Sequence, residues 1–303
     1  MNTTVATVPA GLVPLISSSE SGPLGLIHLP RLWLKMRYHA AGMLPEGYRH
    51  GTGGFDGALL DAIGVDGEAF AAYIDAERPD YLKLEGWVRA NARDTSEATI
   101  RAYNEKTLGV RFGEPRRLEW IERFGLGEDT TYASGIELNQ LDDWAAVHAQ
   151  ITAPDAPSTL MYPAISTPIT GPLGLIHLPR LWLKHLLHGA GRLPAEYRHG
   201  ASGVDLRIAE KTGFDPDGFR AFVEGERPDY LAAEAWVRRN ATALTTENIT
   251  ELREYTQVTR MPAELEVQRR ARLNFPDTSF NLGYALNQLD DWFSIHEQLI
   301  AAT

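Results

Sequence analysis

The stretch GPLGLIHLPRLWLK occupies residues 22–35 and occurs again, letter for letter, at residues 171–184. Each residue of the second occurrence has a number 149 higher than its counterpart, as 171 stands against 22. Self-similarity over this distance is typical of two copies of one domain, since solenoid repeats recur at roughly 20–50 residues. The fold that this stretch begins is therefore expected twice.

The similarity extends well beyond the repeated stretch. The same offset relates YRHG at residues 48–51 to YRHG at residues 197–200. Near the end of each copy, NQLDDW at residues 139–144 recurs at residues 287–292. The sequence therefore predicts two homologous helical domains in tandem, related by pseudo-twofold symmetry.

The repeat also sets the expected boundaries. We expect an N-terminal arm at residues 1–20, a first domain at 21–151, a linker at 152–170 and a second domain at 171–303. The linker contains four prolines, which favour an extended chain. The arm occupies the equivalent place before the first copy, so each copy could carry such a segment.

The repeated stretch carries the signals of a helix. Pro30 suits the first helical position, and Gly42 suits the residue that ends a helix. At about 100° per residue, Trp33 lies on one side of this helix while Leu34 and Tyr38 lie nearly opposite. A helix that is apolar on two sides is buried. Strand signals are few, so we predict an all-α, or mainly α, protein.

The composition narrows the class of protein. A net charge of −11 argues against a nucleic-acid partner, because phosphate contacts need a basic surface. The absence of cysteine excludes disulfides and thiolate chemistry. No basic segment followed by an apolar run begins the sequence, and no stretch reaches the roughly 18 apolar residues of a membrane span. We therefore expect a cytoplasmic protein without a membrane partner.

A polar stripe runs along the expected helix between its two apolar sides. Arg31, Lys35 and His39 are spaced four residues apart, and Arg180, Lys184 and His188 repeat the pattern. An arginine can bind a carboxylate or phosphate through two hydrogen bonds, and a lysine or histidine can transfer a proton. The alternative is a structural network of ion pairs, with carboxylates such as Glu85, Asp142 and Asp143 opposite the cations.

Other polar residues could join such a site. His28 and His177 precede the helix in the two copies, and His185 replaces Met36 in the second copy. The glycine-flanked triplets Tyr48-Arg49-His50 and Tyr197-Arg198-His199 could form a lid or clamp, or an ordinary surface loop. One central cleft could also take residues from both copies, as in a fused dimer.

Metal and cofactor signals are weak in this sequence. His148 follows Asp142 and Asp143 by six and five positions, which departs from the four-residue spacing of helical metal pairs. The GTGG segment at residues 51–54 follows no strand, as a dinucleotide-binding loop would. We therefore expect neither a metal nor a cofactor.

Several short patterns in the first copy resemble a bacterial family known only as domain of unknown function 5069. They are Leu29-Pro30-Arg31, Lys35, Gly42, Gly64-Val65-Asp66, Trp87-Val88 and residues 96–104. The resemblance covers most of each copy and implies a compact, helix-rich fold without naming an activity. The second copy departs from it at ELREYTQV, which carries no counterpart of Asn104, and family members are usually single copies.

We expect an enzyme of small-molecule metabolism that needs no cofactor and acts by proton transfer on an acidic substrate, as a lyase, isomerase or cyclase. The expected catalytic residues are His39, His188, His185, Lys35, Lys184, Tyr48 and Tyr197. The expected substrate-binding residues are Arg31, Arg180, His28, His177, Arg49, Arg198, His50 and His199. The alternative is a non-catalytic small-molecule-binding or scaffold protein whose stripe is structural. We also expect the two copies to pack against each other within one chain. The sequence leaves open whether two chains form a homodimer.

Overall fold

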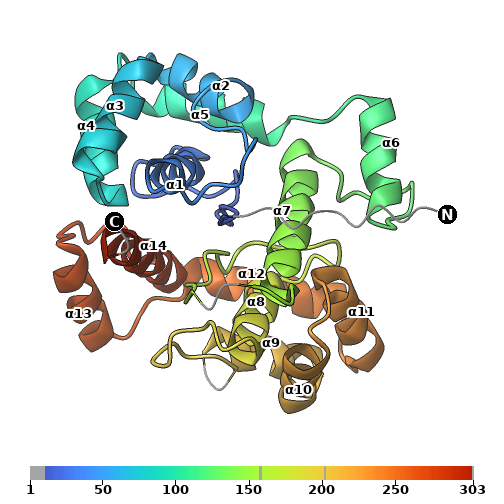
Figure 1. Ribbon diagram of the computed structural model, residues 1–303. Helices are drawn as coiled ribbons and strands as arrows, with labels where there is room; N and C mark the ends of the chain where they lie inside the picture. The colour runs from blue at the N-terminus through green and yellow to red at the C-terminus, as the bar shows by residue number, and fades with distance from the viewer. Residues whose placement is uncertain (1–10, 157–158, 201–202, 302–303) are drawn as a thin grey trace.

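The computed structural model describes residues 11–156, 159–200 and 203–301, and within these ranges the regular structure is α-helical (Figure 1). The helices of the first half are α1 (Leu29–Ala40), α2 (Gly54–Ile63), α3 (Gly67–Glu77), α4 (Tyr81–Asn91), α5 (Glu97–Leu108), α6 (Glu114–Arg123) and α7 (Gly135–Thr152). Those of the second half are α8 (Leu178–Gly189), α9 (Val204–Thr212), α10 (Pro216–Glu226), α11 (Tyr230–Asn240), α12 (Thr246–Val258), α13 (Ala263–Leu273) and α14 (Gly283–Ala301). The predicted all-α fold is confirmed.

Helix α1 is buried along almost its whole length. Pro30 occupies the first turn of the helix. His28, the residue just before the helix, has a left-handed backbone conformation with a φ of 69°, so the chain changes direction there. Trp33 and Leu34, on different sides of the helix, are both fully buried. Helix α8 repeats this arrangement. The two apolar sides therefore place α1 and α8 inside the protein, and the arginine and lysine of each polar stripe are buried with them.

Several helix starts follow the expected capping chemistry. Ser96 caps α5 by accepting a hydrogen bond from the Thr99 amide, and Thr245 caps α12 through the Asn248 amide. Ser134 begins α7 with a reciprocal capping box, which fixes the start of the long helix that carries Asp143.

The last helix of each half packs against the other half. Helix α7 contacts α11, and α14 contacts α4 (Figure 1). Trp144 of α7 meets Tyr230 edge to face at 4.6 Å between ring centroids, and Trp292 of α14 meets Tyr81 at 4.7 Å. All four rings are buried, so both halves contribute to one hydrophobic core. A pseudo-twofold relation between the halves remains a prediction.

The segments before α1 and α8 are extended and packed. Arm residues 11–20 contribute buried side chains such as Ile16, and the linker contributes Ile165. The Met161 amide donates to the Arg192 carbonyl at 2.8 Å, which fastens the linker beside the end of α8. Residues 1–10 of the predicted arm and 157–158 of the predicted linker lie outside the described residues.

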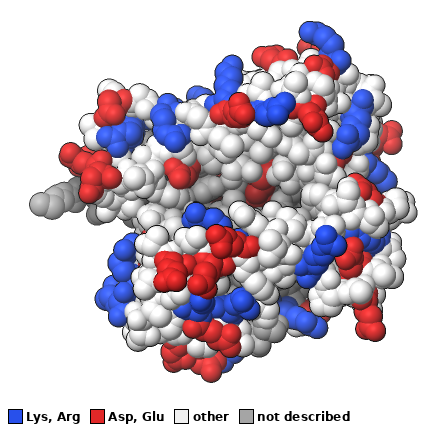
Figure 2. Space-filling model, turned by 180° about the vertical axis from the view of Figure 1, so that it is seen from behind, with Lys and Arg blue, Asp and Glu red and all other residues white. Residues whose placement is uncertain are grey.

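The surface carries charges of both signs. Figure 2 shows acidic and basic side chains interspersed over one face. None of the described helices combines the length and apolar character needed to cross a bilayer. Any preference for an anionic ligand must therefore come from local geometry, because the chain as a whole is acidic.

Candidate functional site

Arg31 lies at the centre of a buried network that ties four segments together. One terminal nitrogen donates to the backbone carbonyls of Pro14 and Ile16, at 2.7 and 2.8 Å. The other donates to the Tyr48 hydroxyl at 2.7 Å and forms an ion pair with Asp143 at 2.8 Å. The Tyr48 hydroxyl in turn donates to Asp143 at 2.7 Å. The charge of Arg31 is therefore matched inside the protein.

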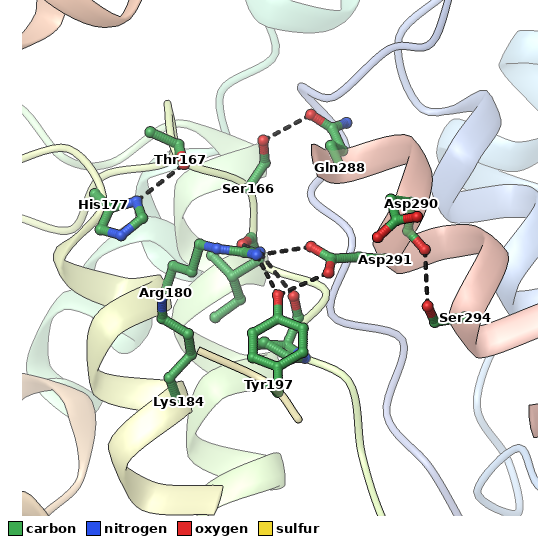
Figure 3. Close-up of polar contacts among 12 residues, drawn as sticks. Ser166, Thr167, His177, Arg180, Lys184, Tyr197, Gln288, Asp290, Asp291 and Ser294 are labelled. Carbon is green, nitrogen blue, oxygen red and sulfur yellow. Dashed lines mark hydrogen bonds and ion pairs between the residues drawn. The ribbon is translucent and has the colours of Figure 1, made fainter. Parts of the chain in front are cut away.

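The second half repeats the network around Arg180 (Figure 3). Its guanidinium donates to the carbonyls of Pro163 and Ile165, both at 2.8 Å, and pairs with Asp291 at 2.7 Å. Tyr197 accepts a hydrogen bond from Arg180 and donates one to Asp291 at 2.7 Å. Two of the expected substrate-binding arginines, Arg31 and Arg180, are thus each paired with a protein aspartate.

Lys35 and His28 share one buried carboxylate, that of Asp56 at the start of α2. Lys35 Nζ lies 2.5 Å from Asp56 Oδ2, and His28 Nε2 lies 2.6 Å from Oδ1. The other ring nitrogen of His28 meets the Ser18 hydroxyl at 2.9 Å. The Gly51 amide also donates to Asp56 at 3.0 Å, so this carboxylate holds the loop that carries the Tyr48 triplet.

Lys184 and His177 share Asp205 in the same way. Lys184 Nζ lies 2.5 Å from Asp205 Oδ2, and His177 Nε2 lies 2.6 Å from Oδ1. His177 also meets the Thr167 hydroxyl at 2.9 Å, and the Gly200 amide donates to Asp205 at 2.8 Å. Lys35 and Lys184 therefore both face protein carboxylates.

The electrostatics of the two networks follow from burial and pairing. Burial raises the pKa of Asp56, but the hydrogen bond from His28 and the charge of Lys35 outweigh it and lower that pKa to about 2. Burial lowers the pKa of His28 and of His177 to about 4, although each histidine faces a carboxylate. Both histidines are thus neutral near pH 7, where the two aspartates are ionised. Burial also lowers the pKa of Lys35 and of Lys184, against the attraction of their aspartates.

The stripe leaves the buried networks at His39, in the last turn of α1. His39 is exposed and stacks on His50 with ring centroids 3.9 Å apart. His50 Nδ1 lies 3.0 Å from the Tyr48 carbonyl, so donation from Nδ1 leaves Nε2 as an acceptor. A pocket of about 400 Å³ opens here, and its lining includes His39, Glu46, Tyr48, Arg49 and His50. Four of the expected site residues therefore meet at one opening.

The equivalent region of the second half has a different composition. His188 and His199 are also 3.9 Å apart between ring centroids, and His188 Nδ1 lies 2.9 Å from Glu224 of α10. His185 lies behind them and is buried, whereas Arg198 is exposed. The imidazole pair is thus present in both halves, and in the second half His185 and Glu224 lie beside it.

Three acidic partners were not predicted from the sequence, and two of the predicted ones lie elsewhere. Asp56 and Asp205 bind the lysines, and both copies keep this aspartate while the residue before it changes. The presence of this aspartate in both copies is the sequence signal that could have identified it as a partner of the lysine. Nothing in the spacing pointed to Glu224, which reaches His188 from another helix. Glu85, expected opposite the stripe, instead accepts hydrogen bonds from the Tyr81 hydroxyl and the Leu24 amide.

Of the other two carboxylates expected opposite the cations of the stripe, one is buried and one lies at the surface. Asp143 fulfils the expectation, whereas Asp142 pairs with Arg123 at 2.7 Å in a half-exposed position. The buried networks can stabilise the fold, because each arginine and lysine in them is already paired with an aspartate. The pocket adds two imidazoles, a group that serves as acid or base in catalysis, and the guanidinium of Arg49, which can hold an anion.

Residues 16–143 match the family model described as Domain of unknown function (DUF5069), and this part of the chain resembles that family. The match contains Arg31, Lys35, Asp56 and Asp143, and therefore both buried ion pairs of the first half. No curated protein and no solved structure matches the chain.

Proposed function

We propose that this protein binds a small anionic molecule in the pocket beside His39 and His50 and moves a proton on it. In this proposal Arg49 binds the anion, while His39 and His50 act as acid and base. The supporting observation is that the pocket gathers these three accessible groups, whereas Arg31 and Lys35 are already paired with Asp143 and Asp56. A cytoplasmic location is part of the same proposal.

The buried networks have a positioning role in this proposal. Tyr48 is held by Arg31 and Asp143, and the Gly51 amide is held by Asp56. These contacts fix both sides of the Arg49-His50 segment, so the two side chains are presented by a loop with a restrained backbone. A restrained loop loses less conformational freedom when a ligand binds. The reaction class that fits is a lyase, isomerase or cyclase step using acid–base catalysis.

A second candidate is a non-catalytic binding or scaffold protein. The observation that favours it is the pairing of the arginines and lysines of the stripe with buried aspartates, which has the arrangement of a structural core. The two candidates differ in whether a bound molecule exchanges protons with the protein.

The experiment is a screen of small carboxylates and phosphate monoesters by ligand-observed NMR in D₂O. We expect at least one compound to bind and to exchange a carbon-bound hydrogen for deuterium. Arg49→Ala should weaken binding at least about tenfold, as loss of a charge-assisted hydrogen bond implies. The matched control is Arg198→Ala, its counterpart in the second half.

The variant His39→Ala/His50→Ala should still bind the compound and should no longer exchange its hydrogen. Binding without exchange in the unaltered protein would support the non-catalytic candidate instead. Binding that is indifferent to Arg49→Ala, or equally sensitive to Arg198→Ala, would overturn the location of the site.

A further inference from the structure

Three potential metal ligands converge in the second half. His188 lies in the last turn of α8, His199 in the loop that follows, and Glu224 in α10. Each offers one ligand atom, and these atoms all lie within 4.8 Å of one another. Among the described residues, this is the group of histidines and carboxylates close enough to surround one ion. The three come from separate segments, so the fold creates the cluster.

A fourth residue supports the cluster from the protein interior. His185 lies one turn before His188 on α8 and is only 1% exposed. Its Nδ1 is buried without a hydrogen-bond partner and lies 3.6 Å from Glu224 Oε1. A buried ring nitrogen without a hydrogen-bond partner has lost its contact with water and gained no replacement. Such groups are therefore rare in folded proteins. A Glu224 carboxylate held in place by an ion would give His185 a fixed acceptor.

The orientation of His199 also suits coordination. Its Nδ1 lies 3.3 Å from the Tyr197 carbonyl, which favours the tautomer protonated at Nδ1. The Nε2 lone pair is then free. Histidine ligands in metal sites commonly donate their second nitrogen to a backbone carbonyl in this way.

We infer that His188, His199 and Glu224 form a binding site for a divalent transition-metal ion, with Zn²⁺ the best match. Two imidazoles and one carboxylate are a ligand set that suits Zn²⁺, and three protein ligands leave one position for water or a substrate atom. Tetrahedral zinc with bonds of about 2.0–2.1 Å separates its ligand atoms by roughly 3.3 Å. The 2.9 Å between His188 and Glu224 therefore needs only a small widening. His185 is a positioning residue for Glu224.

The first half provides an internal comparison. His39 and His50 keep the same imidazole pair, at the same 3.9 Å between centroids. The position equivalent to Glu224 is Asp75, whose side chain is one methylene shorter and exposed, and Met36 stands where His185 would be. The inferred metal site therefore belongs to the second half. It is independent of the anion pocket, which lies in the first half.

The test is a zinc titration of the full-length, untagged chain after treatment with EDTA. Isothermal titration calorimetry should show one Zn²⁺ bound per chain. Glu224→Gln and His188→Ala should each weaken that binding by at least about tenfold. His39→Ala is the matched control and should leave the affinity and the stoichiometry unchanged.

Two further measurements distinguish a residue that coordinates the metal from one that only stabilises the fold. Co²⁺ substituted for Zn²⁺ should give visible absorption that Glu224→Gln alters, and the far-ultraviolet circular dichroism of the metal-free variants should match that of the unaltered chain. His185→Met, which installs the first-half residue, should weaken Zn²⁺ binding by about tenfold without changing the stoichiometry.

Three outcomes would overturn the inference. One is the absence of stoichiometric binding at tens of micromolar Zn²⁺. Another is binding that survives His188→Ala combined with His199→Ala. The third is binding that His39→Ala weakens as much as His188→Ala does, since that would place the ion in the first half.

Discussion

The Asp143 carboxylate on α7 lies 2.8 Å from the Arg31 guanidinium on α1, and both side chains are about nine-tenths buried. Because burial alone would disfavour the charged guanidinium, the attraction of Asp143 is what keeps the pKa of Arg31 above its usual value. The pair therefore joins the first helix of this half to its last helix.

Removing one partner of this pair should destabilise the protein strongly. Asp143→Asn leaves the Arg31 charge buried without an anion, which costs about 3–5 kcal/mol in comparable buried pairs. Chemical denaturation followed by circular dichroism would measure the loss. The neighbouring Asp142→Asn is the control, because its half-exposed pair with Arg123 is worth about 1 kcal/mol or less. Equal losses in the two variants would contradict a structural role for the Arg31–Asp143 pair.

A second prediction concerns the lysine of the other half. Lys184→Met should leave buried Asp205 with hydrogen bonds from only neutral His177 and the Gly200 amide, so the melting temperature should fall by several degrees. Differential scanning calorimetry would measure this change. Lys83→Met is the control, because the Lys83 side chain is largely exposed although its partner Asp80 is buried. An unchanged melting temperature for Lys184→Met would show that the buried lysine serves something other than stability.

The sequence predicted the parts of this structure that depend on local pattern. The burial of α1 and the shared side of Arg31 and Lys35 both follow from spacing along one helix. Asp56 was missed because a loop brings it beside Lys35. The regular spacing of residues along one helix says nothing about the path of such a loop. Likewise, a repeat does not reveal whether a copy's last helix packs on its own half. The contact of Trp144 with Tyr230 therefore could not be foreseen.

The pH dependence of stability should include a contribution from Glu20. Its Oε1 accepts the amides of Ser17 and Ser166, at 3.2 and 3.4 Å, while its buried Oε2 has no hydrogen-bond partner. Burial raises the pKa of Glu20 from 4.5 to about 8. Between these values the folded protein keeps a proton that the unfolded chain has released. The free energy of unfolding should therefore fall as the pH rises through this window, by about 1.4 kcal/mol per pH unit.

Two variants would isolate that contribution. Glu20→Gln keeps an acceptor for the two amides, and Glu20→Ile installs the residue that the second half has at Ile169. Glu85 also has its pKa raised by burial, to about 7, so the unaltered protein and the variants must be compared at each pH. The stability difference should grow in favour of both variants between pH 5 and 8, as urea denaturation would measure. Parallel pH profiles would contradict the prediction.

The last prediction explains a glycine inside the repeated stretch. A Cβ placed on Gly22 would lie 2.6 Å from Glu85 Oε1 and would also overlap the Tyr81 ring. Glu85 is buried and holds the Leu24 amide, so it cannot move without breaking that contact. Gly22→Ala should therefore destabilise the protein by about 1–3 kcal/mol, the usual cost of overpacking.

Gly86 offers the matched substitution on the same helix as Glu85. It lies on the exposed side of α4, and a Cβ there would meet no atom within 4 Å. Alanine is the better helix former by up to about 1 kcal/mol, so Gly86→Ala should stabilise the protein. Urea denaturation of both variants would thus give shifts of opposite sign. A Gly22→Ala variant as stable as the unaltered chain would mean that the Tyr81–Glu85 pair can yield, and that the glycine is not required by packing.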